Sequence, residues 1–318
     1  MEDLTPIGDP GRWQDLSLER CGDAALITMH RLKKDPRAAR QAGNNLDDRL
    51  MGELKAALAL VEGDPGIKSI VLASGHRLAF CIGAKIDQVL GATFDQALEF
   101  VRNGQELLLM IHRLKKPVVA ALNGLTFGGG LELAMACDYR ICGDRENVRL
   151  GLPETSLGVI PAMGGTQNLV RLIGEAKAKE FILTAKVDID AGLAKSDGLV
   201  DRVVASDVLV SEALGFARSV PAKRSNFDLG APTTDRLLIR REIEERFAGW
   251  RPDQEREGRG APLAQALVHY VFETTSPRSF LDAILHEQEA FARLSVTADA
   301  QEGVRAMLEE RKPVFRRK

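Results

Sequence analysis

The chain has 318 residues, of which 45% are apolar and 28% are charged, and its formal net charge at pH 7 is −2. This balance is typical of a globular protein with a sizeable core, and it excludes a strongly basic chain that binds nucleic acid through overall charge. We therefore expect one large domain, or a domain with an appendage, and no nucleic-acid partner.

The cysteines and the N-terminus point to an intracellular protein. Cys21, Cys81, Cys137 and Cys142 form no CxxC pair and have no histidine cluster beside them, so we interpret them as reduced thiols. Residues 1–4 are acidic where a targeting peptide is basic, and no run approaches the ~20 apolar residues of a membrane span. The expectation is a soluble cytoplasmic protein with no metal site and no membrane contact.

The first part of the chain alternates strand and helix patterns. Residues 1–20 contain Pro and Gly with little periodicity, which predicts a poorly ordered leader. Residues 24–29 predict a strand, residues 46–61 place leucines on one helix face, and residues 67–73 predict a buried strand. This order favours an α/β architecture with crossover connections, either a spiral or a doubly wound sheet.

A glycine run then connects a buried strand to a helix. After a long amphipathic helix over 94–114, residues 118–122 are apolar throughout, which predicts a strand buried on both faces. Gly128-Gly129-Gly130 follows, and residues 131–137 resume with helix-forming side chains. The peptide N–H groups at such a helix start can bind an oxygen that gains negative charge, and Glu132 lies in the first turn. Alone, this pattern fits an ordinary glycine-rich turn equally well.

Later motifs change that balance. They read Leu150-Gly151-Leu152-Pro153-Glu154, Leu157-Gly158-Val159-Ile160-Pro161 and Gly164-Gly165-Thr166-Gln167. With the glycine run, and in this order, they resemble the enoyl-CoA hydratase (crotonase) family, closest in style to the hydratase portion of multifunctional fatty-acid oxidation enzymes. The resemblance implies an α/β, crotonase-like spiral of strand-strand-helix units with a C-terminal helical region. No GxGxxG for a dinucleotide accompanies it.

The resemblance also implies roles for particular residues. The peptide N–H groups of Gly129 and Ile82 would form an oxyanion hole, Glu132 would act mainly on water, and Glu154 would mainly protonate carbon. Further contacts to the CoA substrate are implied for the loop around Ile82 and for the first glycine of the run: Ala79, Cys81, Gly83, Ala84, Lys85, Ile86 and Gly128. Family members usually carry Asp where this chain has Lys85, which marks either altered substrate contacts or a solvated surface charge.

The rest of the chain predicts further helices and one strand. We expect helices over 174–183, 190–195, 206–219, 264–272 and 279–293, and a strand over 198–204. The alternating charges over 221–260 favour a solvated helix face. The predicted organisation is a leader (1–20), a spiral core with the active site (21–205), and a C-terminal helical oligomerisation region (206–318).

The leading hypothesis is hydration of a 2-enoyl-CoA to the 3-hydroxyacyl-CoA in fatty-acid β-oxidation, since family members that hydrate usually carry both carboxylates. It requires no cofactor beyond the CoA of the acyl-CoA substrate, and the resemblance implies a homotrimer or a dimer of trimers. Alternatives are a double-bond isomerase, a thioester hydrolase, or a non-catalytic protein on the same fold that binds RNA through its basic tail.

Overall fold

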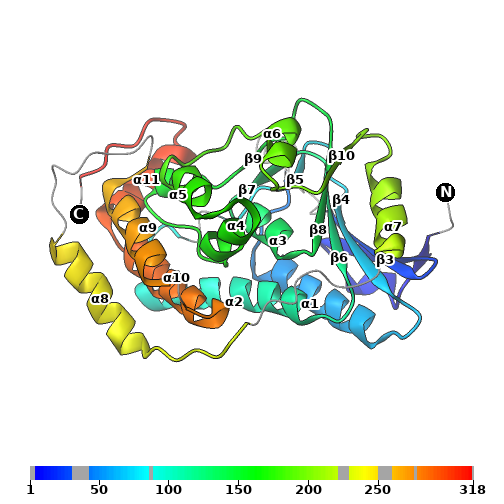
Figure 1. Cartoon of the computed structure of the whole chain (residues 1–318), viewed down its shortest axis with the longest axis horizontal. Helices are drawn as coiled ribbons and strands as arrows, with labels where there is room; N and C mark the ends of the chain where they lie inside the picture. The colour runs from blue at the N-terminus through cyan, green and yellow to red at the C-terminus, as the bar shows by residue number, and fades with distance from the viewer. Residues whose placement is uncertain are drawn as a thin grey trace. The chain divides into compact units, whose positions relative to one another are not determined.

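The computed structural model describes residues 4–30, 43–85, 89–220, 229–249, 260–275 and 278–316. They form two compact units whose segments alternate along the chain (Figure 1). Unit 1 comprises residues 1–84, 106–150 and 188–226, and unit 2 comprises residues 85–105, 151–187 and 227–318. The predicted division at residue 205 differs from these units, because residues 21–205 and residues 206–318 each contribute to both.

Unit 1 is built on a seven-stranded sheet in the order β1-β2-β3-β4-β6-β8-β10. Its first three strands are antiparallel neighbours, and from β3 to β10 the neighbours are parallel. Parallel neighbours require crossover connections, which agrees with the strand and helix alternation in the sequence. The strands are β1 (Thr5–Pro6), β2 (Leu16–Cys21), β3 (Ala24–Met29), β4 (Ser69–Ser74), β6 (Val118–Leu122), β8 (Tyr139–Gly143) and β10 (Arg202–Val204).

Strand β6 lies between β4 and β8, and all of its residues are buried. Val118 pairs with Ile70 on one side, and Val119 pairs with Tyr139 on the other. A strand with neighbours on both sides and covered faces needs no polar side chains, which is why the sequence is uninterrupted Val, Ala and Leu. The predicted buried strand over 118–122 is confirmed.

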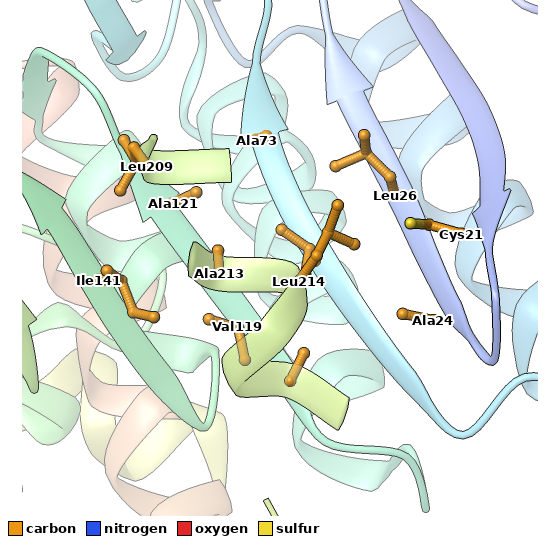
Figure 2. Close-up of a cluster of buried hydrophobic side chains, with 12 residues drawn as sticks. Cys21, Ala24, Leu26, Ala73, Val119, Ala121, Ile141, Leu209, Ala213 and Leu214 are labelled. Atoms are coloured by element: carbon orange, nitrogen blue, oxygen red, sulfur yellow. The ribbon is translucent and has the colours of Figure 1, made fainter. Parts of the chain in front are cut away.

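Helix α7 (Leu209–Ser219) covers one face of this sheet. Figure 2 shows its apolar side chains packed against alternating residues of the strands. The cluster comprises Cys21, Ala24, Leu26, Val71, Ala73, Val119, Ala121, Ile141, Leu209, Ala213, Leu214 and Ala217. The predicted boundary at residue 205 is therefore too early, because α7 completes the core of the sheet.

Shorter elements complete unit 1. Asp47 caps α1 by accepting a hydrogen bond from the Leu50 N–H (3.1 Å), and the leucine face of this helix is buried as predicted. A second sheet has the order β5-β7-β9. These elements are η1 (Pro10–Arg12), α1 (Asp48–Gly63), β5 (Ala79–Cys81), β7 (Leu125–Phe127), α3 (Gly129–Ala136) and α6 (Ala191–Ser196), with Leu150 of β9 (Leu150–Gly151).

The prediction of a poorly ordered leader over residues 1–20 is wrong for its described part. Residues 16–21 form β2, which pairs with β3 along its whole length. Leu16 and Leu18 alternate with more exposed residues, so one face of β2 joins the core. The Pro and Gly residues lie before residue 12, and the prediction wrongly treated residues 16–20 as poorly ordered too.

Unit 2 is helical in its described part. Helix α2 (Phe94–Arg113) contributes residues 94–105 to unit 2 and residues 106–113 to unit 1. The other elements are η4 (Glu154–Leu157), α4 (Gly165–Ile173), α5 (Glu175–Leu183), α8 (Arg236–Gly249), α9 (Pro262–Thr275), α10 (Phe280–Ser295) and α11 (Ala298–Leu308). The predicted C-terminal helical region is confirmed.

Helix α8 corrects the interpretation of the charged stretch. Its Ile239 and Ile243 are buried one turn apart, and its charged residues pair with α9 and α10 along its length. The pairs are Arg236 and Arg240 with Glu289 (2.8 and 2.7 Å), Glu242 with Tyr270 (2.9 Å), Glu244 with Arg293, and Arg246 with Glu273. The predicted solvated face is restricted to outward residues such as Arg241 and Glu245.

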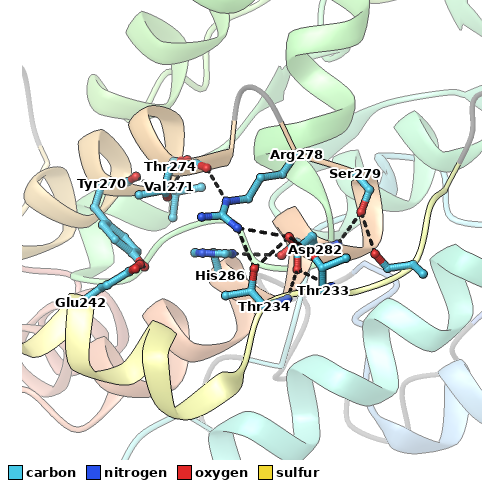
Figure 3. A network of polar contacts seen from close by, with 11 residues as sticks. Thr233, Thr234, Glu242, Tyr270, Val271, Thr274, Arg278, Ser279, Asp282 and His286 are labelled. Carbon is cyan, nitrogen blue, oxygen red and sulfur yellow. Dashed lines mark hydrogen bonds and ion pairs between the residues drawn. The ribbon is translucent and has the colours of Figure 1, made fainter.

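Asp282 fixes the segment that leads into α8 (Figure 3). Its carboxylate accepts hydrogen bonds from the backbone and hydroxyl groups of Thr233 and Thr234 at 2.9–3.1 Å, and Arg278 lies 3.3 Å away. Burial disfavours the charged carboxylate, but the hydrogen bonds from Thr234 and Thr233 outweigh it and lower the pKa of Asp282 to about 2. The carboxylate is therefore charged at neutral pH.

Among the residues that the structure describes, no helix is both long enough and apolar enough to cross a membrane.

Candidate active site

The glycine run forms the N-terminus of α3, as predicted. Gly128 precedes the helix with φ 53° and ψ −131°, a conformation that side-chain-bearing residues rarely adopt. The N–H groups of Leu131 and Glu132 donate to the Gly128 carbonyl oxygen (2.8 and 3.0 Å). Within the described stretches of chain, the Gly129 N–H makes no hydrogen bond. As far as the described residues go, this N–H is available to an oxygen at the positive end of the helix dipole.

The loop after β5 lies directly against this helix start. Gly83 has φ 90°, and a Cβ atom on it would come within 2.9 Å of the Phe127 carbonyl oxygen and 3.3 Å of the Gly129 nitrogen. A Cβ atom on Gly130 would come within 2.1 Å of the Cys81 carbonyl oxygen. The two segments thus meet backbone against backbone, which requires glycine on both sides.

The second predicted donor is already paired. The Ile82 N–H donates to the Asn44 carbonyl oxygen at 3.0 Å. Asn44 is buried, and its side-chain amide donates to Ser74 Oγ and to the Phe80 carbonyl oxygen, both at 2.9 Å. The sequence interpretation treated the Ile82 N–H as open. Its oxyanion role stays a prediction, and it now requires Asn44 to share or release this hydrogen bond.

Helix α3 holds Glu132 in a buried position. The side chain is 2% exposed, and every other residue of the helix is buried as well. At the end of the helix, the buried Arg140 guanidinium donates to the carbonyl oxygens of Cys137 (2.7 Å) and Leu199 (2.8 Å). Asp138 accepts a hydrogen bond from the Val118 N–H (2.8 Å). Hydrogen bonds thus attach the C-terminal end of the helix that carries Glu132 to β6 and to the segment before β10.

Asn44 and Arg140 are positioning residues that the sequence interpretation missed. Asn44 stands just before the predicted helix over 46–61, and Arg140 follows Asp138 at the start of β8. The available signal for Arg140 was a charged residue directly before the apolar Ile141 and Cys142. For Asn44 the sequence offers no comparable signal, because the partners of its side chain are 15 to 36 residues away in the chain.

The other residues predicted to contact the substrate are divided between the two units. Ala79, Cys81, Gly83, Ala84 and Gly128 belong to unit 1, Lys85 belongs to unit 2, and Ile86 lies outside the described residues. Ala84 forms a β-bridge with Leu46, and the Lys85 side chain is exposed, as a surface charge would be. Burial raises the pKa of the Cys81 thiol to about 12, so Cys81 is a neutral thiol at physiological pH.

Glu154 begins the short helix η4 in unit 2 and is half-buried. Pro153 precedes the turn, and Gly158 ends it with φ 82°. The Thr155 hydroxyl donates to the Ile182 carbonyl oxygen, and the Thr155 carbonyl oxygen accepts from the Ala261 N–H, both at 2.7 Å. The backbone that carries Glu154 is therefore bonded to the end of α5 and to the residue before α9.

Across the described ranges, no group of three or more His, Cys, Asp or Glu side chains could hold a metal ion.

Comparison with known proteins identifies the family. Residues 25–227 match the family model described as enoyl-CoA hydratase/isomerase. The chain belongs to the enoyl-CoA hydratase/isomerase family. The family predicted from the motifs is confirmed, and with it the assignment to a family of enzymes.

Individual relatives agree with this family. The chain is 35% identical to a probable enoyl-CoA hydratase of Rhizobium meliloti, over 96% of this chain and 98% of that protein. It is 40% identical to the fatty acid oxidation complex subunit alpha of Shewanella loihica, over 61% of this chain and 27% of that protein. A crystal structure of an enoyl-CoA hydratase from Bacillus anthracis has a TM-score of 0.59 and 27% identity, over 96% of this chain and all of that one. The crotonase-like fold is therefore confirmed.

Proposed function

We propose that the protein adds water across the double bond of a 2-enoyl-CoA to give the 3-hydroxyacyl-CoA. The observation that supports this most is the start of α3, where the Gly129 N–H makes no hydrogen bond to any described residue and the buried Glu132 side chain lies within one helical turn. A thioester oxygen at the N–H would place the conjugated double bond near a group able to orient water.

The proposed reaction balances as a simple addition. A water oxygen attacks C3 of the enoyl group, one water proton leaves to a carboxylate, and C2 receives a proton from a carboxyl group. Negative charge gathers on the thioester oxygen in between, and peptide N–H donors stabilise it. One such donor is typically worth about 3 kcal/mol, and each proton-transfer group about 10²–10⁴-fold in rate.

The roles of the two glutamates come from the family resemblance. Glu132 acts mainly on the water, and Glu154 mainly delivers the proton to C2. Glu154 is half-buried at the start of η4, and Glu132 is buried in the first turn of α3. The backbone next to each glutamate is hydrogen-bonded to other parts of the same unit.

The second oxyanion donor needs a small rearrangement under this proposal. The Ile82 N–H bonds to the Asn44 carbonyl oxygen, so a thioester oxygen must share that N–H or replace the carbonyl. The Gly129 N–H carries the larger part of the binding until that exchange occurs.

Several broader features are proposed on the same basis. The fatty acid oxidation complex relative suggests a place in fatty-acid β-oxidation. A cytoplasmic location and a homotrimer or dimer of trimers follow from the family resemblance. We also propose that no cofactor takes part other than the CoA moiety of the substrate.

The test is a product analysis. Purified protein is mixed with trans-2-butenoyl-CoA in ¹⁸O-labelled water, and the thioester products are identified by mass spectrometry. Hydration predicts 3-hydroxybutanoyl-CoA that carries one labelled oxygen. An unchanged mass with a shifted double bond indicates an isomerase, and free CoA with labelled butenoate indicates a hydrolase; either as the main product contradicts the proposal.

A further inference from the structure

Helix α11 touches the turn that carries Glu154 through two glycines. A Cβ atom on Gly303 would lie 2.5 Å from the Leu157 carbonyl oxygen, and one on Gly158 would lie 2.7 Å from the Ala300 backbone nitrogen. The residues involved all belong to unit 2. The turn and the helix therefore pack with no side chain between their backbones at these points.

Gly303 stands in the interior of α11, where glycine costs roughly 1 kcal/mol relative to alanine. The helix itself gains nothing from this residue. The contact with Leu157 explains it, because real Cβ atoms essentially never approach a backbone atom within 3.0 Å. An alanine at this position would force the turn and the helix apart by roughly 0.5 Å or more.

The helix is fixed well enough to hold the turn in place. The Thr297 hydroxyl accepts the Ala300 N–H (3.2 Å) and donates to the Leu294 carbonyl oxygen (2.6 Å). The Gln301 side chain donates to the Ser295 carbonyl oxygen (2.7 Å) and accepts from the Gly91 N–H (2.8 Å). The N-terminal half of α11 is thus bonded to α10 and to the loop before α2.

We propose that Gly303 is a positioning residue for the reaction: by letting α11 contact the carbonyl of Leu157, it sets where the Glu154 carboxyl lies. The inference rests on the proposed function, in which Glu154 is the proton donor. It gives the C-terminal helices a part in the active site beyond the predicted role in oligomerisation. Leu157 and Glu154 are the two ends of the four-residue helix η4. A displacement of the Leu157 backbone therefore also displaces Glu154.

The test is a double-mutant cycle on hydration of trans-2-butenoyl-CoA, with wild type, Gly303→Ala, Glu154→Gln and the double variant. Displacements below 1 Å commonly slow an enzyme by about 10-fold or more, so G303A should lower kcat about 10-fold and change KM less than about 2-fold. In the E154Q background the same substitution should have no further effect, because the group it positions is gone. A general loss of structure would lower both backgrounds by the same factor.

Gly52→Ala is the matched control. Gly52 lies in the interior of α1, is exposed, and would place its Cβ atom with nothing within 4 Å. Gly52→Ala should keep the wild-type kcat and raise the unfolding midpoint slightly. If G303A shows no cooperative unfolding, Thr297→Ala replaces it in the cycle. This substitution removes the hydroxyl that caps α11 and adds no atom. We expect it to lower kcat in the wild-type background and to have no further effect in the E154Q background.

The outcomes separate the two proposals. A wild-type protein that does not hydrate the substrate contradicts the proposed function, and this inference with it. If wild type hydrates and E154Q is slow, but G303A keeps the full kcat or slows both backgrounds equally, the positioning role alone is overturned.

Discussion

The peptide N–H of Ile82 donates to the carbonyl oxygen of Asn44, with 3.0 Å between nitrogen and oxygen. The family resemblance assigns this N–H to the thioester oxygen, so the donor is paired before substrate binds. The Gly129 N–H, on the opposite segment, makes no hydrogen bond within the described residues. The proposed oxyanion site therefore combines one open donor with one that must be exchanged.

Contact between these two segments predicts the effect of Gly83→Ala. The new Cβ atom would press on the Phe127 carbonyl oxygen at 2.9 Å and force a side-chain residue to φ 90°. We expect kcat for hydration to fall about 10²-fold, because one oxyanion donor shifts away. Infrared spectra of a bound thioester with a ¹³C-labelled carbonyl should show a smaller shift of the C=O band than wild type.

Gly91→Ala is the control for this substitution. Gly91 also has a positive φ, 75°, but its Cβ atom would meet nothing within 4 Å. It should share the backbone strain and keep the wild-type C=O shift. Equal C=O shifts in Gly83→Ala and wild type would contradict the placement of the oxyanion site.

Asn44 should contribute to stability as well as to the site. Asn44→Ala removes the donors to Ser74 Oγ and the Phe80 carbonyl oxygen in a fully buried place. Unpaired buried acceptors cost about 1–3 kcal/mol each, so the free energy of unfolding should fall by about 2 kcal/mol in urea titrations. Asn147→Ala, which removes a longer amide bond to Leu78 (3.3 Å) near the surface, should cost less than about 1 kcal/mol. Equal losses for both variants would refute the role of Asn44.

The pairing of α8 predicts a large effect for one carboxylate and almost none for another. Glu289 is fully buried and bonded to Arg236 and Arg240, whereas Glu245 is exposed with Arg241 at 4.0 Å. Glu289→Gln should lower the free energy of unfolding by about 2 kcal/mol, because it removes the charge of a buried carboxylate that pairs with two partly exposed arginines. Glu245→Gln should change it by less than about 0.5 kcal/mol. Thermal unfolding monitored by circular dichroism separates them, and similar midpoints would be inconsistent with a buried attachment of α8.

The low pKa of Asp282 predicts a stability change in acid. The carboxylate has a pKa of about 2 in the folded protein and about 3.9 when unfolded, so its contribution is complete above pH 4. It is lost as the pH falls from about 4 to 2, and amounts to about 2 kcal/mol. Urea titrations should show wild type more stable than Asp282→Asn by a constant amount from pH 7 to 5, and by a shrinking amount below pH 4. A difference independent of pH down to 2.5 would contradict the assignment.

Local patterns predicted most of the secondary structure. Residues 118–122 are apolar because β6 is a central strand. In α1, Asp47 caps the first turn and the leucines that follow form the buried face. The glycines at 128–130 predicted an open helix start, and the structure adds a close backbone contact with the loop around Gly83 that the sequence did not predict. Such features depend on near neighbours in the sequence, which is why they are readable there.

Other features depend on distant partners and could not be predicted. The pairing of Ile82 with Asn44 joins segments whose register no local pattern encodes. In α8, alternating charges look the same whether they face water or the complementary charges of α9 and α10. The isoleucines at 239 and 243 were the available sign that one face is buried.

The central claim is that two acidic side chains, Glu132 and Glu154, carry out the hydration. The most direct measurement is the rate at which purified wild type, Glu132→Gln and Glu154→Gln consume trans-2-butenoyl-CoA, followed by the loss of enoyl-thioester absorbance at matched folded fractions. We predict that wild type consumes the substrate and that each variant is slower by about 10²–10⁴-fold. A rate near that of wild type in either variant would contradict the account.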